Sequence, residues 1–157
     1  MGKSFKKLTA EERKLNNEKG RFIESLAKKL YQLSGWVVVP MQIVKEENDQ
    51  FRSVINYEEL RKLKNYNTII DIITEGTTEF NKINEKFRFP DFVCEKNDVF
   101  MFVEVKSSDV NVSQMKQRKT LEFLGKKGYK VEILTLPISR EDFVKANLTK
   151  KGGFFSL

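Results

Sequence analysis

In the first forty-five residues, hydrophobic positions recur first at the spacing of a helix and then at the spacing of a strand. Thr9 stands three positions before Glu12, which is the capping-box spacing of a helix start. The apolar residues that follow recur at helical spacing and predict one buried stripe, made of Phe22, Ile23, Leu26, Leu30 and Leu33. We therefore predict a helix that could break at Gly20 and ends before Gly35. Residues 36–45, WVVVPMQIVK, predict a buried strand that is interrupted or kinked at Pro40.

A second clear pattern begins at Phe89. The segments FPDFVC and VFMFVEVK, separated by the turn EKND, predict a two-stranded hairpin. A helix from about Ser113 to Leu124, a strand in GYKVEILTL and a short capped helix at 140–147 should follow. This order of elements predicts an α/β fold in a single domain over 1–157, with a mixed sheet flanked by helices.

Residues 46–88 have no single period. They combine a polar turn, a short helix around Tyr57 to Leu63 and apolar pairs, and we interpret them as an insertion between the first and second core strands. The last ten residues, LTKKGGFFSL, are rich in glycine and lysine and are expected to form a flexible tail at 148–157.

Composition narrows the possible functions. The 157 residues include 29 Lys+Arg against 22 Asp+Glu, a net charge of +7, which favours a polyanionic partner such as nucleic acid. Solubility alone would explain the same charge. A single cysteine, Cys94, and the lack of a secretory signal indicate an intracellular setting, which for a viral protein would be the host cytoplasm. No apolar run is long enough to span a bilayer, so we expect no membrane association.

The chain has no histidine, which excludes Ser-His-Asp and Cys-His mechanisms and histidine-based nuclease chemistry. With one cysteine, a structural zinc site is also excluded. A catalytic metal would need oxygen ligands, which favours Mg²⁺ or Mn²⁺.

The segment FVEVKSSD, residues 102–109, places two charges inside an apolar strand. Glu104 and Lys106 share one face with Phe102, because alternate side chains of a strand point the same way. Burying both charges is costly without good geometry. Asp91 follows Pro90 at the start of the preceding strand, and the hairpin would bring it beside Glu104. Two carboxylates could hold a hard cation while the lysine positions water or stabilises charge on a phosphate.

These residues carry a resemblance to a known family. PD at Pro90 and Asp91, followed by EVK at 104–106, resembles the PD-(D/E)XK nuclease superfamily. KGRFIESLAKKLYQLSGWVVV, residues 19–39, is similar to the first helix of archaeal Holliday junction resolvases, which implies that Glu24 helps to bind metal. The segment VSQMKQRKTLEFLGKKGYKVEI resembles virus-type replication-repair nucleases, which implies that Gln117 approaches the active site.

The resemblance implies a restriction-endonuclease-like core and a Mg²⁺- or Mn²⁺-dependent endonuclease acting on DNA. The implied metal ligands are Asp91, Glu104 and Glu24, with Lys106 and Gln117 completing the catalytic set. Glu24 would equally suit a solvated helix face, and Gln117 a buried amide bonded to backbone carbonyls. Acids of the insertion could replace Glu24 as a ligand: Asp71, Glu75, Glu79 and Glu85.

Several basic residues are candidate phosphate contacts: Arg88, Lys116, Arg118, Lys119, Arg61, Lys62 and Lys64. Each is also a typical solvated surface charge. Phe51, Tyr57 and Tyr66 of the insertion could stack on unpaired bases or simply pack.

The substrate remains open at the level of sequence. Resolving a four-way junction would need two sites and hence a homodimer, whereas a general duplex or single-strand nuclease of viral or mobile-element replication would not. RNA cleavage by the same chemistry is a further version. Two other classes compete: a nucleic-acid-binding module without catalysis, and a structural or regulatory protein in which EVK is a chance charge pair.

Overall fold

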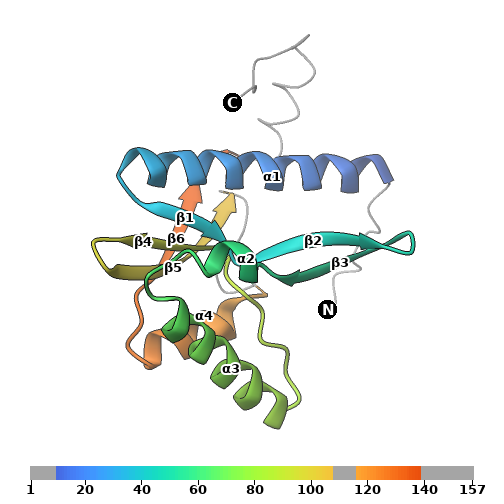
Figure 1. Cartoon of the computed structure of the whole chain (residues 1–157). Coiled ribbons are helices and arrows are strands. Elements are labelled where there is room, and N and C mark those ends of the chain that lie inside the picture. The colour runs from blue at the N-terminus through green and yellow to red at the C-terminus, as the bar shows by residue number, and fades with distance from the viewer. Residues whose placement is uncertain (1–9, 108–115, 139–157) are drawn as a thin grey trace, which may run out of the picture.

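A four-stranded mixed sheet lies at the centre of the computed structural model, which describes residues 10–107 and 116–138 (Figure 1). Its strand order is β1-β4-β5-β6. The first three strands are antiparallel neighbours, and β6 runs parallel to β5. The strands are β1 Val37–Pro40, β4 Phe92–Lys96, β5 Val99–Ser107 and β6 Val131–Leu136. The predicted α/β class, the mixed sheet flanked by helices and the hairpin are therefore confirmed.

Helices cover both faces of this sheet. α1 (Ala10–Leu33) lies along one face, and α3 (Tyr66–Lys82) and α4 (Arg118–Lys126) lie on the other (Figure 1). Successive side chains of each strand point to opposite faces of the sheet and enter two buried apolar clusters. Phe102 packs towards α3 and α4, while Met101 and Val103 pack towards α1. The chain thus builds two apolar layers on one sheet.

The predicted stripe of α1 is only partly correct. The helix runs unbroken through Gly20. Its buried apolar side chains are Ile23, Ala27 and Tyr31, spaced by four residues, with Lys19 buried one step earlier, whereas Leu30 and Leu33 are 44% and 85% exposed. A helix that packs on a sheet buries only a narrow stripe, and the small side chain of Ala27, which is fully buried, lets the backbone come close.

The predicted buried strand at 36–45 is interrupted after Pro40, and its second half does not belong to the sheet. Met41 is buried in the core, and β2 (Gln42–Glu47) then pairs with β3 (Gln50–Ile55) in a separate two-stranded sheet. All of β2 is exposed, so the prediction of a buried strand there is wrong. We call this hairpin, residues 42–55, the arm. Asn48 and Asp49 form its turn with positive φ, which a two-residue hairpin turn requires.

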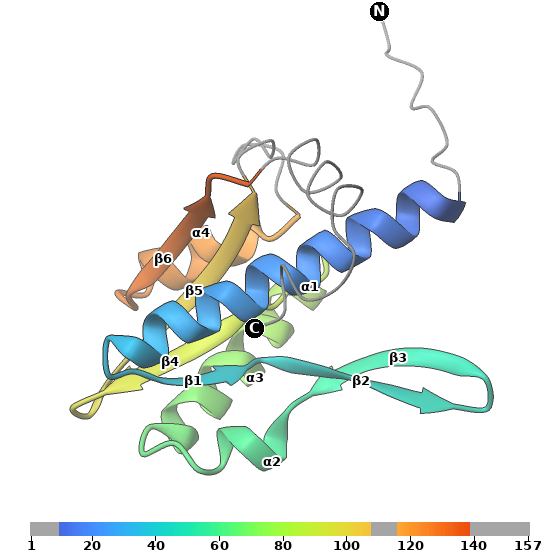
Figure 2. The ribbon, with the colours of Figure 1, turned by 90° about the horizontal axis from the view of Figure 1, so that it is seen from above.

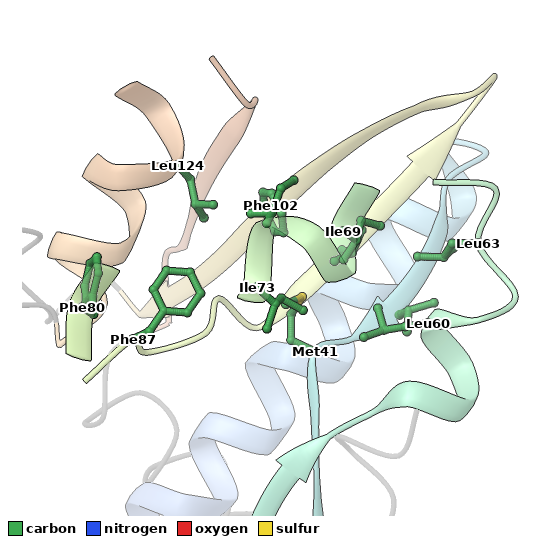
Figure 3. Packing of buried hydrophobic residues seen from close by; sticks show 12 residues of the cluster. Met41, Leu60, Leu63, Ile69, Ile73, Phe80, Phe87, Phe102 and Leu124 are labelled. Atoms are coloured by element: carbon green, nitrogen blue, oxygen red, sulfur yellow. The ribbon is translucent and has the colours of Figure 1, made fainter. Parts of the chain in front are cut away.

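The insertion at 46–88 contributes far more to the fold than its sequence indicated. The predicted short helix is α2 (Tyr57–Leu60), but β3 and α3 were not predicted. α3 supplies much of the larger cluster, including Ile69, Ile73 and Phe80 (Figure 3). Its β-branched residues and Gly76 have weak helix propensity, so packing against the sheet stabilises it.

Some predictions concern residues outside the described ranges. They are the cap at Thr9, the helix start at Ser113, the helix at 140–147 and the tail; α4 as described begins at Arg118. Within the described ranges, no helix combines the length and the apolar character needed to cross a membrane.

Candidate active site

The β4–β5 hairpin places Asp91 beside Glu104. Phe92 pairs with Val103, so the residue before β4 falls level with the next residue of β5. Glu104 and Lys106 lie on the Phe102 side of β5 by strand alternation, as predicted. This side faces α3 and α4 rather than α1.

Backbone groups fix the two carboxylates. The N–H of Asp91 donates to Glu104 Oε1 at 3.2 Å, and the N–H of Val105 donates to Asp91 Oδ2 at 2.8 Å. The Glu104 side chain is fully buried, yet its Oε2 accepts no hydrogen bond. Lys106 Nζ lies 3.4 Å from that oxygen, close enough for an ion pair but without hydrogen-bond alignment. An acceptor oxygen is therefore left over in the interior, which is costly.

Burial and the proximity of Asp91 raise the pKa values of two glutamates, Glu104 and Glu24. Desolvation, followed by contact with Asp91, raises the pKa of Glu104 to about 9, although Lys106 opposes the shift. Desolvation and the charge of Asp91 also raise the pKa of Glu24 to about 7, against Lys106 and Arg21. Asp91 thus interacts with both glutamates. The three acids form a chain of contacts at the end of the sheet.

α1 contributes the third acid and two cations to a cleft of about 430 Å³ in front of Asp91. Arg21 and Lys28 lie three residues before and four residues after Glu24, so all three share one helix face. Each of them lines the cleft together with Asp91. Neither cation was among the predicted phosphate contacts, although the same spacing could have indicated both.

Gln117 lies at the mouth of this cleft. It precedes α4 as the N-cap residue instead of lying within the helix, and its Oε1 accepts a hydrogen bond from Lys106 Nζ at 3.4 Å. Leu121 and Leu124 are buried on the same helix, in agreement with the predicted inward stripe. The amide of Gln117 therefore contacts the lysine of the site.

The predicted basic residues form two groups, one near the cleft and one after α2. Arg88 and Gln117 line a second cavity of about 220 Å³ next to the cleft. Nearby, Lys119 pairs with Glu85, Arg118 pairs with Glu122 at 3.7 Å, and Lys116 is exposed.

The other predicted cations, Arg61, Lys62 and Lys64, follow α2 and do not line the cleft. Lys64 Nζ pairs with Asp98 at 2.8 Å, in the turn of the β4–β5 hairpin and thus at the opposite end of β4 from Asp91. Lys62 pairs with Glu59 on its own helix. The structure therefore does not bring this group to the carboxylates.

The acids of the insertion do not join the cluster. Glu75 pairs with Lys127, Glu79 with Lys82 and Glu85 with Lys119, while Asp71 is exposed on α3. Glu24 is therefore the third acid next to Asp91. Across residues 10–107 and 116–138, no three His, Cys, Asp or Glu side chains are arranged closely enough to form a ready metal site.

The site combines three interacting acids, a lysine held by an amide, and two cations in front of them. Comparison of the chain with protein-family models, with curated proteins and with solved structures gave no match in any of the three.

Proposed function

We propose that this protein is a metal-dependent endonuclease that hydrolyses phosphodiester bonds in DNA. The observation that carries the proposal is the second oxygen of Glu104, a buried acceptor with no hydrogen bond beside Asp91 and Lys106. Buried polar atoms are normally satisfied, and the exceptions need an explanation. A carboxylate that coordinates a cation during function explains this one.

The topology supports a restriction-endonuclease-like core. The elements α1, β1, β4, β5, α4 and β6 follow in the order expected of that core, with β6 parallel to β5. Asp91 lies before β4, and Glu104 and Lys106 lie on β5, so the residues of the PD-(D/E)XK resemblance meet at one end of the sheet. The arm, α2 and α3 then form an insertion between β1 and β4.

The donor set fits Mg²⁺ or Mn²⁺, because these ions prefer carboxylate oxygens. Asp91 and Glu104 would be the ligands, and Glu24 would complete the set from α1. Such an ion supplies electrostatic stabilisation of the phosphate and increases the acidity of a water molecule. It would also compete with the protons that Glu104 and Glu24 bind without it.

The other side chains have roles that follow from their positions. Lys106 is 19% exposed, so its ammonium reaches from the buried acid towards solvent. There it can orient the attacking water or stabilise negative charge that develops on the phosphate. Gln117 restrains that ammonium. Arg21 and Lys28 line the cleft and attract the phosphate backbone.

Cleavage of labelled DNA tests the proposal. Linear duplex, single-stranded and four-way-junction DNA are each incubated with Mg²⁺, Mn²⁺ or EDTA. We expect metal-dependent cutting by the native protein and none by Asp91→Asn. Glu122→Gln, which alters an exposed acid on α4, is the matched control and should cut normally. Cutting that persists in EDTA, or in Asp91→Asn, would overturn the assignment.

The choice of substrate belongs to the same experiment. Preference for the four-way junction would favour a resolvase that acts as a homodimer, and cutting of other forms would favour a replication or repair nuclease. An RNA strand of the same sequence tests for ribonuclease activity.

One observation favours a second candidate function, a DNA-binding module without catalysis. Lys106 Nζ lies 3.4 Å from Glu104 Oε2, so an ion pair already offsets part of the charge of the cluster without a metal. This candidate predicts DNA binding that is unaffected by EDTA and by Asp91→Asn, with no cleavage of any substrate.

A further inference from the structure

The two faces of the arm carry different sets of side chains. It projects from the end of the central sheet as a two-stranded ribbon (Figure 2). Cross-strand partners share a face, so Gln42, Ser53 and Phe51 lie on one side and Ile43, Lys45 and Arg52 on the other. The first set lines cavities, and so does Arg52 of the second set, whereas Ile43 and Lys45 line none of the three cavities near the site.

Those cavities form one path from the acids to the arm. Gln42 and Phe89 line all three of them: the cleft, the 220 Å³ cavity beside Arg88, and a cavity of about 690 Å³ beneath Phe51. Lys86 lines both the second and the third. We call the second and third cavities together the arm groove.

The arm groove combines positive charge with aromatic surface. Its lining includes Arg52, Lys86 and Arg88, and no acidic residue is among the residues that line it. Phe51 lines the far end with its side chain 75% exposed, next to Tyr57. Cations that follow a groove, interleaved with exposed aromatic rings, are the features of sites that bind single-stranded nucleic acid.

The tip of the arm argues against a duplex in this place. Glu46, Glu47 and Asp49 are exposed there and carry three negative charges. A ribbon that entered a groove of double-stranded DNA would bring these charges against two phosphate backbones. A single strand that runs beneath the arm, on the Phe51 face, meets Lys86 and Arg88 instead, and Glu46, the cross-strand partner of Phe51, is the tip acid that shares this face.

We propose that the arm groove binds an unpaired strand of DNA that continues from the phosphate in the cleft, with a base stacked on Phe51. This inference rests on the proposed nuclease function and specifies its substrate: DNA with a single-stranded segment beside the cleaved bond. Lys86 and Arg88 contact the phosphates of that segment. The arm then acts as a specificity element rather than as part of the catalytic centre.

Binding in EDTA tests the groove separately from cleavage. A 12-nucleotide single strand with 2-aminopurine at successive positions is titrated with the native protein, and a duplex of the same sequence is titrated alongside. We expect 2-aminopurine fluorescence to be quenched at one position, with tighter binding of the single strand than of the duplex. Phe51→Ala should abolish the quenching and weaken single-strand binding by roughly 5- to 100-fold.

Matched variants separate stacking from damage to the arm. Ile43→Ala truncates an apolar side chain on the opposite face and should bind like the native protein. Phe51→Trp keeps a stacking surface and should retain the quenching. Lys86→Ala should lower the salt dependence of single-strand binding by about 0.7 in the log–log slope, which corresponds to one phosphate.

The results distinguish failure of the groove from failure of the nuclease. If Phe51→Ala and Ile43→Ala bind the single strand equally well, the groove proposal is overturned. The same holds if Phe51→Ala loses as much affinity for the duplex as for the single strand. The Asp91→Asn assay tests the nuclease, and Ile43→Ala should still cut in a metal-dependent manner. Absence of metal-dependent cutting, together with normal quenching, would refute the metal-dependent nuclease and leave the groove intact.

Discussion

Asp91 and Glu104 hold each other through reciprocal strand contacts. The N–H of Asp91 donates to Glu104 Oε1, and the Asp91 carboxylate accepts the N–H of the residue that follows Glu104. The backbone of the β4–β5 hairpin thus forces two carboxyl groups together, and Glu104 Oε2 receives no hydrogen bond. Two carboxyl groups placed this close together disfavour negative charge in the metal-free protein. A bound cation would relieve that repulsion, at a cost in stability when it is absent.

Stability without metal should fall as pH rises. The pKa of Glu104 is raised to about 9 and that of Glu24 to about 7, from 4.5 for an ordinary glutamate. Between pH 4.5 and about 9 the folded protein therefore binds more protons than the unfolded chain, so each increase in pH favours unfolding. Urea unfolding in EDTA at pH 5, 7 and 9 measures this. Greatest stability at pH 9 would refute the raised pKa values.

Glu104→Gln is the matched variant for this effect. Glutamine cannot ionise, so the free energy of unfolding should depend less on pH. Without metal at pH 8, the variant should be more stable than the native protein by about 1–3 kcal/mol, because Glu104 must take up a proton to become buried and glutamine need not. A variant that is less stable at pH 8 and keeps the native pH dependence would show that Glu104 is not the strained group.

Lys106 should matter for the chemical step more than for binding. Lys106→Met removes the ammonium that contacts Glu104 and Gln117, and we expect single-turnover cleavage to slow by about 10²- to 10⁴-fold. DNA affinity in EDTA should change little, since other cations line the cleft. Lys62→Met, at an exposed lysine that pairs with Glu59, is the control and should cleave at the native rate. Equal rates for both variants would remove Lys106 from the mechanism.

Two helical glycines should respond to alanine in opposite ways. A Cβ at Gly76 on α3 would lie 2.5 Å from the ring of Phe87, which is itself buried among Phe80, Phe89 and Phe123. Gly76→Ala should therefore lower the free energy of unfolding by about 1–3 kcal/mol. A Cβ at Gly125 on α4 meets nothing within 4 Å, and Gly125→Ala should add roughly 0.5–1 kcal/mol. Thermal or urea unfolding compares the two; the same sign for both would contradict this packing.

Glu95 attaches the insertion to the central sheet. Its buried carboxylate accepts hydrogen bonds from the backbone N–H groups of Lys64 and Asn65 and from the Asn65 side chain, at 2.9–3.0 Å. Glu95→Ala should cost about 2–4 kcal/mol of unfolding free energy, because charged acceptors make strong bonds and the donors would be left unpaired. Glu58→Ala, at an exposed acid on α2, should be nearly silent. Similar losses for both would exclude this role.

The sequence predicted what local rules determine. A strand alternates its side chains and a tight turn sets the register, so the meeting of Asp91 with Glu104 and the shared face of Glu104 and Lys106 follow from a few residues. The same rules gave the mixed α/β sheet.

The parts that were not predicted depend on tertiary packing. α3 has weak intrinsic helix propensity and is stabilised by its contacts with the sheet, while β2 and β3 form their hydrogen bonds with each other in a separate ribbon. The stripe of α1 was misplaced because alanine contributes little to a hydrophobic pattern, although Ala27 is fully buried where α1 packs on the sheet. Arg21 and Lys28 share a helix face with Glu24 by spacing alone, and they were missed because this spacing was not applied to the basic residues of α1.

Mn²⁺ binding, followed by the electron paramagnetic resonance signal of free Mn²⁺, tests the central claim most directly. At pH 8 the native protein should remove Mn²⁺ from solution, more strongly than at pH 6, where protons compete for the carboxylates. Glu104→Gln should bind at least tenfold more weakly while it keeps the native circular-dichroism spectrum. Equal binding by both proteins, or no binding by the native protein, would contradict a metal site at Asp91 and Glu104.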